Sequence, residues 1–385
     1  MHKWTDEEIR VHVIGVFVLI VAMLACAMLG EVSRQNWNSK VTAYPTQTEE
    51  AIENYARQLL QKMTLEQKVG QMFYAADGVD PVTAAQYGLG GVLLQTEQLE
   101  NLSKTEIQAV LKGYKAEAEV PILVGVNEEG GQVNTLSVLP QVRGKAFLSA
   151  RELLTTGGLK LVDADTREKA DLLRELGVDL NLAPVCDVVE GKTAMMYDRS
   201  GGGEGDDAGR YVQTVLEAMT ERRIIGVLKY FPGYGELPSQ SHSYVLTDTR
   251  SLEELETVAL LPFAQGIDAG AQAVMMANVI VSAVDEKVPA SLSRNVHDLL
   301  RKDLDFDGVV ISGDLSDHGM SHYGDGGELA VLAVQAGSDL LLTEEYEAGI
   351  EAVIRAVNMN HISVERIDES VLRILKMKIA NGMME

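Results

Sequence analysis

Short apolar runs alternate with amphipathic stretches along most of this chain, from about residue 51 onward. Continuous apolar runs of this length, bounded by turn residues, are typical of strands that are buried on both faces. The stretches between them have helical spacing, and the one at 251–266 opens with Ser251 and carries Glu254 three residues later, which is the pattern of a capping box. The predicted strands lie at 71–75, 90–94, 122–126, 179–183, 225–229, 273–277, 308–312 and 338–342.

Eight strands separated by helices predict parallel pairing with crossover connections. A closed (β/α)8 barrel of the TIM type satisfies this pattern, because such barrels need about 250 residues and hide both faces of every strand. We therefore expect one α/β barrel over residues 49–385, with its site at the C-terminal ends of the strands. A doubly wound open sheet is the structural alternative.

The N-terminus carries an apolar run over 13–30, which is 18 residues without a charged side chain. That length is at the threshold for a helix that crosses a bilayer. We predict a short tail at 1–10, a transmembrane signal anchor at 11–30 and a polar linker at 31–48. A cleaved signal peptide, a buried core helix and a lipoprotein-type cleavage site at Cys26 are the alternatives. A short tail before a single span favours a single-pass membrane protein whose barrel is extracytoplasmic.

The chain has 385 residues and a formal net charge of −24. So acidic a surface repels phosphate backbones, and we expect no nucleic acid among the partners. The two cysteines do not make a disulfide framework. His318 and His322 have metal-ligand spacing, with Asp314 and Asp317 nearby, but a polar loop after the seventh strand is the preferred interpretation. We expect no cofactor and no metal.

Polar residues follow several predicted strands directly, which is where a barrel builds its pocket. Asn127 follows the third strand, and Arg199 lies in the loop after the fourth. Lys229 ends the fifth strand, while Gly313 and Asp314 end the seventh. In a closed barrel these residues converge.

Five segments together carry a family resemblance. Residues 229–235 (KYFPGYG), with Ser241 and His242 after them, resemble the sugar-binding and acid/base loop of glycoside hydrolase family 3, in its β-N-acetylhexosaminidase branch. The other segments similar to that family are 63–72 (MTLEQKVGQM), 289–293 (PASLS), 306–312 (FDGVVIS) and 369–376 (ESVLRILK). The resemblance runs from about residue 51 to 380. It implies a barrel that hydrolyses glycosides with retention, through a covalent glycosyl-enzyme.

The resemblance also assigns the reacting groups, and here the chain departs from the family. His242 occupies the acid/base position, but its partner aspartate is replaced by Gln240. The nucleophilic aspartate is replaced by Gly313. Asp314 is adjacent, but strand alternation predicts that its side chain faces the helix layer unless a kink at Gly313 turns it inward.

The resemblance implies further that sugar hydroxyls are bound by Asn127, Arg199 and Lys229. The first of these stands where the family has an aspartate. Tyr230 and Tyr234 replace two family histidines, and we expect them to offer stacking faces and hydroxyl contacts to a sugar.

These departures favour a barrel that is catalytically impaired and binds an amino-sugar glycan, such as a peptidoglycan fragment, or a protein partner. With the predicted N-terminal anchor, it would be a membrane-anchored protein of the cell envelope. The alternative is an active exo-β-N-acetylhexosaminidase. It would use Asp314 as nucleophile, or the acetamido group of the substrate itself, with His242 as acid/base.

Overall fold

The computed structural model of the chain describes residues 48–76, 78–238 and 244–384. The predicted membrane anchor at 11–30 lies outside these residues, as does nearly all of the predicted linker. Among the described residues, no helix combines the length and the apolar character needed to cross a membrane. The anchor therefore stays a prediction.

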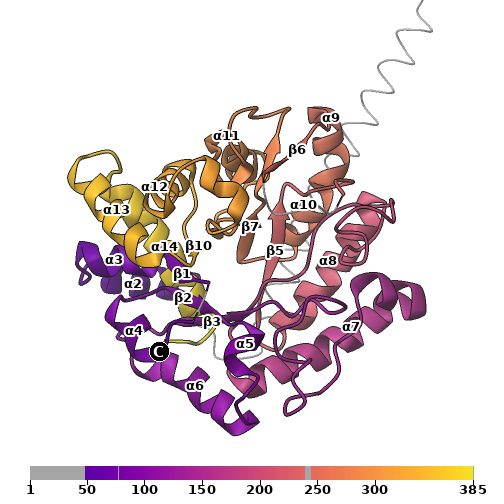
Figure 1. Cartoon of the computed structure of the whole chain (residues 1–385), viewed down its shortest axis with the longest axis horizontal. Coiled ribbons are helices and arrows are strands. Elements are labelled where there is room, and N and C mark those ends of the chain that lie inside the picture. Colours follow the sequence, from indigo (N-terminus) through magenta and orange to yellow (C-terminus); the bar gives the residue numbers. More distant parts are fainter. Residues whose placement is uncertain (1–47, 77, 239–243, 385) are drawn as a thin grey trace, which may run out of the picture.

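Eight parallel strands form a ring at the centre of the molecule (Figure 1). Their order around the ring is β10-β1-β2-β3-β4-β5-β7-β9, and an isolated parallel bridge between Ile311 and Leu340 links the two ends. The ring is thus nearly closed, which confirms the predicted barrel and rules out the open sheet. The strands are β1 (Phe73–Ala75), β2 (Gly91–Leu93), β3 (Leu123–Val126), β4 (Leu180–Asn181), β5 (Ile225–Phe231), β7 (Ala273–Met276), β9 (Val309–Ile311) and β10 (Leu341–Thr343).

Helices cover the outside of this ring, as expected for strands that are buried on both faces (Figure 1). The longer ones are α2 (Glu49–Leu60), α3 (Leu65–Gln71), α6 (Lys104–Ala116), α7 (Ala150–Leu176), α8 (Gly205–Thr220), α10 (Leu261–Asp268), α12 (Gly326–Ala336), α13 (Tyr346–Asn358) and α14 (Val364–Ala380). The shorter ones are α4 (Pro81–Gln86), α5 (Thr96–Leu99), α9 (Leu252–Glu254) and α11 (Arg294–Asp298). The first helix, α2, packs against the last, α14. A small parallel pair, β6 (Leu246–Asp248) with β8 (Val279–Val281), is separate from the barrel ring.

The helix predicted at 251–266 begins as expected but is not continuous. Ser251 and Glu254 make the reciprocal capping box, with the Ser251 N–H donating to Glu254 Oε2 over 2.7 Å. A π-helical turn (Leu255–Ala259) then separates α9 from α10. Pro262 lies at the start of α10. A proline is accommodated there because the N–H groups of a helix's first turn have no partner within the helix, so the missing N–H costs no hydrogen bond.

Tyr74 fills part of the barrel interior and is fully buried. Its neighbour Phe73 points the other way, toward Gly349 of α13, as strand alternation requires. A Cβ at Gly125 of β3 would lie 1.6 Å from the Tyr74 hydroxyl oxygen, so only glycine leaves room for the ring. The pairing of one large residue with glycine on nearby strands is how a small barrel packs its interior.

The seam between β9 and β10 is fixed by Asp339, whose side chain is completely buried. Its Oδ2 accepts from the Val310 N–H (2.9 Å) and from Arg301 (2.6 Å), and its Oδ1 accepts from the Ser370 hydroxyl (2.6 Å). Burial opposes ionisation, but Arg301, Arg366 and Arg373 outweigh it and lower the pKa of Asp339. One carboxylate therefore ties both strands to α14, where Ser370 lies.

We predict that Gly125→Ala destabilises the barrel by about 1–3 kcal/mol, because the added methyl group overpacks the interior against Tyr74. Tyr74→Phe in the same chain should recover part of the loss, since it removes the hydroxyl that the new Cβ would meet. Alone, Tyr74→Phe should be neutral or stabilising, because that hydroxyl is buried without a hydrogen-bond partner among the described residues. Urea denaturation of Gly125→Ala, Tyr74→Phe and the double variant measures the free energy of unfolding of each. A double variant whose loss equals the sum of the two single losses would contradict the prediction.

Candidate active site

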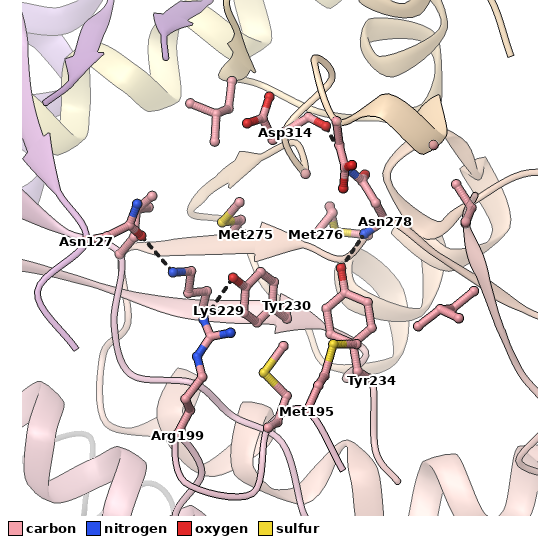
Figure 2. A pocket seen from close by; sticks show the side chains of 18 of the residues that line it. Asn127, Met195, Arg199, Lys229, Tyr230, Tyr234, Met275, Met276, Asn278 and Asp314 are labelled. Carbon is pink, nitrogen blue, oxygen red and sulfur yellow. Dashed lines mark hydrogen bonds between the residues drawn. The ribbon is translucent and has the colours of Figure 1, made fainter. Parts of the chain in front are cut away.

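A pocket of about 300 Å³ opens at the C-terminal ends of the barrel strands (Figure 2). Part of its wall is apolar, with Met195 and Met196 from the loop after β4 and Met275 and Met276 from the end of β7. Methionine is unbranched and polarizable, so such walls adapt to irregular ligand shapes. The polar side chains of the pocket come from the end of β5 and from the loops after β2, β3, β4, β5, β7 and β9.

Glu129 organises the polar side of the pocket. Its Oε1 accepts from Lys229 Nζ and from Arg199 Nη2, both at 2.7 Å, and its Oε2 accepts from Arg199 Nε at 2.8 Å. Lys229 Nζ also donates to Asn127 Oδ1 over 2.7 Å. A single carboxylate in this way joins the loops after β3 and β4 to the end of β5.

The cluster around Glu129 is charged although it is buried, since only 6% of the Glu129 side chain and 3% of the Lys229 side chain are exposed. Burial alone would raise the pKa of Glu129. The charges of Lys229 and Arg199 outweigh that effect and hold the pKa well below its usual range. The carboxylate therefore stays ionised, and it cannot act as a proton donor near neutral pH.

Tyr230 reaches the pocket because of a bulge in β5. The register between β5 and β7 shifts between Lys229 and Phe231, and Tyr230 has a φ of 74°, in the left-handed region. A bulge re-aims side chains that would otherwise alternate between the two faces. Lys229 and Tyr230 are adjacent, yet both line the pocket (Figure 2). Such strained backbone is common at functional sites.

Asp187 positions the loop that follows β5. It is 1% exposed, and its Oδ1 accepts from the N–H groups of Tyr234 (2.6 Å) and Gly235 (2.7 Å). The Tyr234 ring lies edge-on to Tyr230, with centroids 5.2 Å apart, and its hydroxyl accepts from the Asn278 N–H (3.2 Å). Burial raises the pKa of Asp187 to about 6.

Gly313 lines the pocket, and the side chain of Asn278 occupies the space beside it. A Cβ at position 313 would lie 2.2 Å from Asn278 Oδ1 and 2.6 Å from its Cγ. The carboxamide is held on both sides, since Oδ1 accepts from the Ser291 hydroxyl (2.6 Å) and Nδ2 donates to the Asp314 carbonyl (2.7 Å). No side chain fits at position 313 unless Asn278 moves.

Asp314 also lines the pocket, across from Lys229 (Figure 2). The expectation that it faces the helix layer is wrong, because β9 ends at Ile311 and strand alternation no longer applies at 314. Its Oδ1 accepts from the Ser316 N–H (2.9 Å). Burial, together with the nearby charges of Asp317 and Glu344, raises the pKa of Asp314 to about 6.

Seven of the sequence-predicted site residues therefore converge on one pocket: Asn127, Arg199, Lys229, Tyr230, Tyr234, Gly313 and Asp314. Gln240 and His242 lie outside the described residues, so their predicted roles stay predictions. Sequence reasoning missed Asn278 and Ser291. Asn278 comes two residues after β7 ends, and a search of strand ends for polar side chains would have found it.

His318 and His322, the pair with metal-ligand spacing, lie at the ends of one 3-10 turn. Across the described ranges, no group of three or more histidine, cysteine, aspartate or glutamate side chains is arranged to hold a metal ion.

The comparison with known proteins begins with the family profile. The glycosyl hydrolase family 3 N-terminal domain matches residues 64–377, which cover the barrel from α3 to the last helix. The chain belongs to glycoside hydrolase family 3. The family resemblance inferred from the sequence motifs is thereby confirmed.

Relatives of this family 3 chain carry the name β-hexosaminidase. Beta-hexosaminidase LpqI of Mycobacterium tuberculosis is 31% identical over 319 residues, covering 80% of this chain and 79% of that protein. A beta-hexosaminidase of Methylobacillus flagellatus is 30% identical over 264 residues, covering 66% of this chain and 73% of its own length. The chain is thus of the β-hexosaminidase type within family 3.

Solved structures of the same family are similar to this barrel. M. tuberculosis LpqI superposes with a TM-score of 0.76 at 27% identity, and the match covers 84% of this chain and 96% of that one. A family 3 β-N-acetylglucosaminidase from Paenibacillus has the same TM-score of 0.76 at 31% identity, over 83% of this chain. This chain spans only 63% of that longer protein.

We predict that ionisation of the Asp187 carboxyl lowers the free energy of unfolding of the family 3 barrel as the pH rises from about 4 to 6. Its folded pKa of about 6 lies above its unfolded value of 3.8, so the folded state binds more protons in this window. The stability lost on ionisation is about 3 kcal/mol at most. Asp187→Asn keeps the oxygen acceptor but cannot ionise, and urea denaturation between pH 4 and 7 should show a flatter profile.

The exposed Asp268→Asn on α10 is the matched control for this measurement. An Asp187→Asn profile with the same slope as wild type would show that the buried carboxyl does not titrate in this window.

Proposed function

We propose that this chain is a family 3 barrel of the β-hexosaminidase type that binds amino-sugar glycans, or a protein partner, and does not cleave glycosides by the usual nucleophile. One observation carries the proposal: at Gly313, the position that the resemblance assigns to the nucleophile, the carboxamide of Asn278 occupies the space that a side chain would need. Without a carboxylate there, no covalent glycosyl-enzyme forms by the retaining route.

The binding part of the proposal is supported by what the pocket keeps. Arg199 and Lys229 remain at the polar side of the cavity, and Tyr230 and Tyr234 add two aromatic rings. Tyrosine rings offer both an apolar face and a hydroxyl to a sugar. The relatives named β-hexosaminidases support an amino-sugar glycan, such as a peptidoglycan fragment, as the ligand class.

A second candidate function has one observation in its favour. Asp314 lines the pocket, so it is a possible replacement nucleophile in an active exo-β-N-acetylhexosaminidase with His242 as acid/base. With a pKa of about 6, its carboxyl would be ionised above that pH and neutral below it. Hydrolysis by this route would rise with pH through 6 and be lost in Asp314→Asn.

Location is a further part of the proposal. The uncharged run at 13–30 supports a single-pass anchor with the barrel on the extracytoplasmic side. Protease digestion of intact cells, with the chain then probed in membrane fractions, tests this arrangement. Recovery of the chain in the soluble fraction after mild lysis would contradict the anchor.

We predict that the full-length chain releases no aryl group from an aryl N-acetyl-β-glucosaminide above the buffer rate. An active family β-hexosaminidase assayed alongside is the positive control. Turnover that disappears in Asp314→Asn would establish the second candidate function in place of the first.

We predict that Gly313→Asp alone does not create activity, because its Cβ would lie 2.2 Å from Asn278 Oδ1. Gly313→Asp combined with Asn278→Ala provides both the carboxylate and its space, and should exceed the wild-type rate at least about tenfold. An aryl leaving group needs little acid assistance, so the assay isolates the nucleophile. Equal rates in the single and double variants would show that Asn278 does not block the site.

A further inference from the structure

The polar side of the pocket forms a cradle of four residues, Asn127, Arg199, Lys229 and Tyr230, which we call the donor cradle. All four line the pocket, and Figure 2 shows them grouped on one side of it. Glu129 accepts hydrogen bonds from Arg199 and Lys229, and these two in turn bond to Tyr230 and Asn127. The balance of free hydrogen-bond donors and acceptors in this cradle determines which kind of ligand group it can bind.

The donor cradle retains unused donors. Lys229 Nζ has three N–H groups and uses two of them, on Asn127 Oδ1 and Glu129 Oε1. Arg199 uses Nε and Nη2, and within the described ranges its Nη1 makes no hydrogen bond. The Tyr230 hydroxyl accepts from Arg199 and keeps its own proton for donation.

Asn127 adds a further donor, because its orientation is determined by its neighbour. A lysine ammonium only donates, so the atom of Asn127 that faces Lys229 must be the carbonyl oxygen. The amide nitrogen is then turned away from Lys229, as Figure 2 shows. An aspartate, which the resemblance places here in the family, would have offered a second acceptor oxygen instead.

Most of the acceptor capacity of the cradle is already used. Both oxygens of Glu129 accept from Arg199, and Oε1 accepts from Lys229 as well. The one acceptor atom of the Asn127 side chain, its carbonyl oxygen, already accepts from Lys229, so the free donors of the cradle outnumber its free acceptors. Arg199 and Lys229 share the carboxylate of Glu129, so these three side chains together carry one excess positive charge. Only 3% of the Lys229 side chain is exposed.

A neutral sugar hydroxyl needs an acceptor for its proton as well as a donor for its oxygen, whereas an anion needs only donors. We propose that the donor cradle binds an anionic group, a carboxylate or a phosphate, carried by the saccharide ligand. This inference rests on the proposed saccharide-binding function. Asp314 on the opposite side of the pocket repels a second anion there, so the charged end of the ligand is directed to the cradle.

The experiment compares matched sugars by titration calorimetry on the full-length chain. Glucuronate against glucose tests a carboxylate, and N-acetylglucosamine 6-phosphate against N-acetylglucosamine tests a phosphate. We expect the anionic member of at least one pair to bind at least about tenfold more tightly, because charge-assisted hydrogen bonds are about twice as strong as neutral ones. The pair that shows the difference identifies the source of the anion.

Asn127→Asp is the decisive variant, because it is nearly isosteric and returns a carboxylate to the cradle. It should abolish the preference for the anion and strengthen binding of the neutral sugar. Asn358→Asp, at the exposed end of α13, adds the same charge away from the pocket and should leave the preference unchanged. If Asn127→Asp unfolds, salt titration of the wild type serves instead, since raising salt should weaken only the anionic sugars.

The outcomes separate this inference from the function on which it rests. Neutral sugars that bind as tightly as their anionic partners, or anionic binding without salt dependence, would overturn the inference and leave saccharide binding intact. Failure of all four sugars to bind at millimolar concentration would overturn saccharide binding itself, and the inference with it.

Discussion

The site depends on one physical requirement, which is that charges buried in the barrel mouth must be paired. Glu129 meets this requirement for Lys229 and Arg199 at once, and the loops after β3 and β4 and the end of β5 are joined as a result. Removing one partner of such a cluster leaves an uncompensated buried charge, which costs several kcal/mol. The geometry of the pocket is therefore set by electrostatics as much as by packing.

A related requirement, that buried polar groups be hydrogen-bonded, is met beside Gly313. Asn278 is held by Ser291 and by the Asp314 carbonyl, so both polar atoms of its carboxamide are hydrogen-bonded beside Gly313. A buried amide with good partners is compatible with a stable barrel. The pocket thus has a cationic side, while position 313, which the sequence resemblance assigns to the nucleophile, carries no side chain. A well-packed barrel tolerates this because fold and chemistry reside in different parts of the structure.

Most of the fold was predictable from periodicity alone. All eight predicted strands exist, because runs of apolar residues separated by amphipathic helices have few other parallel arrangements that hide both faces. Strand ends also predicted most of the site, including Lys229 and Asn127. The prediction for Asp314 was wrong because it extended strand alternation beyond Ile311, where β9 ends. The bulge at Tyr230 was likewise invisible, since it depends on the register between β5 and β7.

The sequence by itself determined the barrel, the family and the identity of the residues at the ends of its strands, because these follow from spacing and residue type. Only the tertiary structure decided which of those residues face one another. Glu129 became the centre of the site, and Asn278 came to fill the space beside Gly313, through contacts between loops that are far apart in the chain. Such contacts depend on closure of the ring, and no local pattern of residues encodes the distances that closure sets.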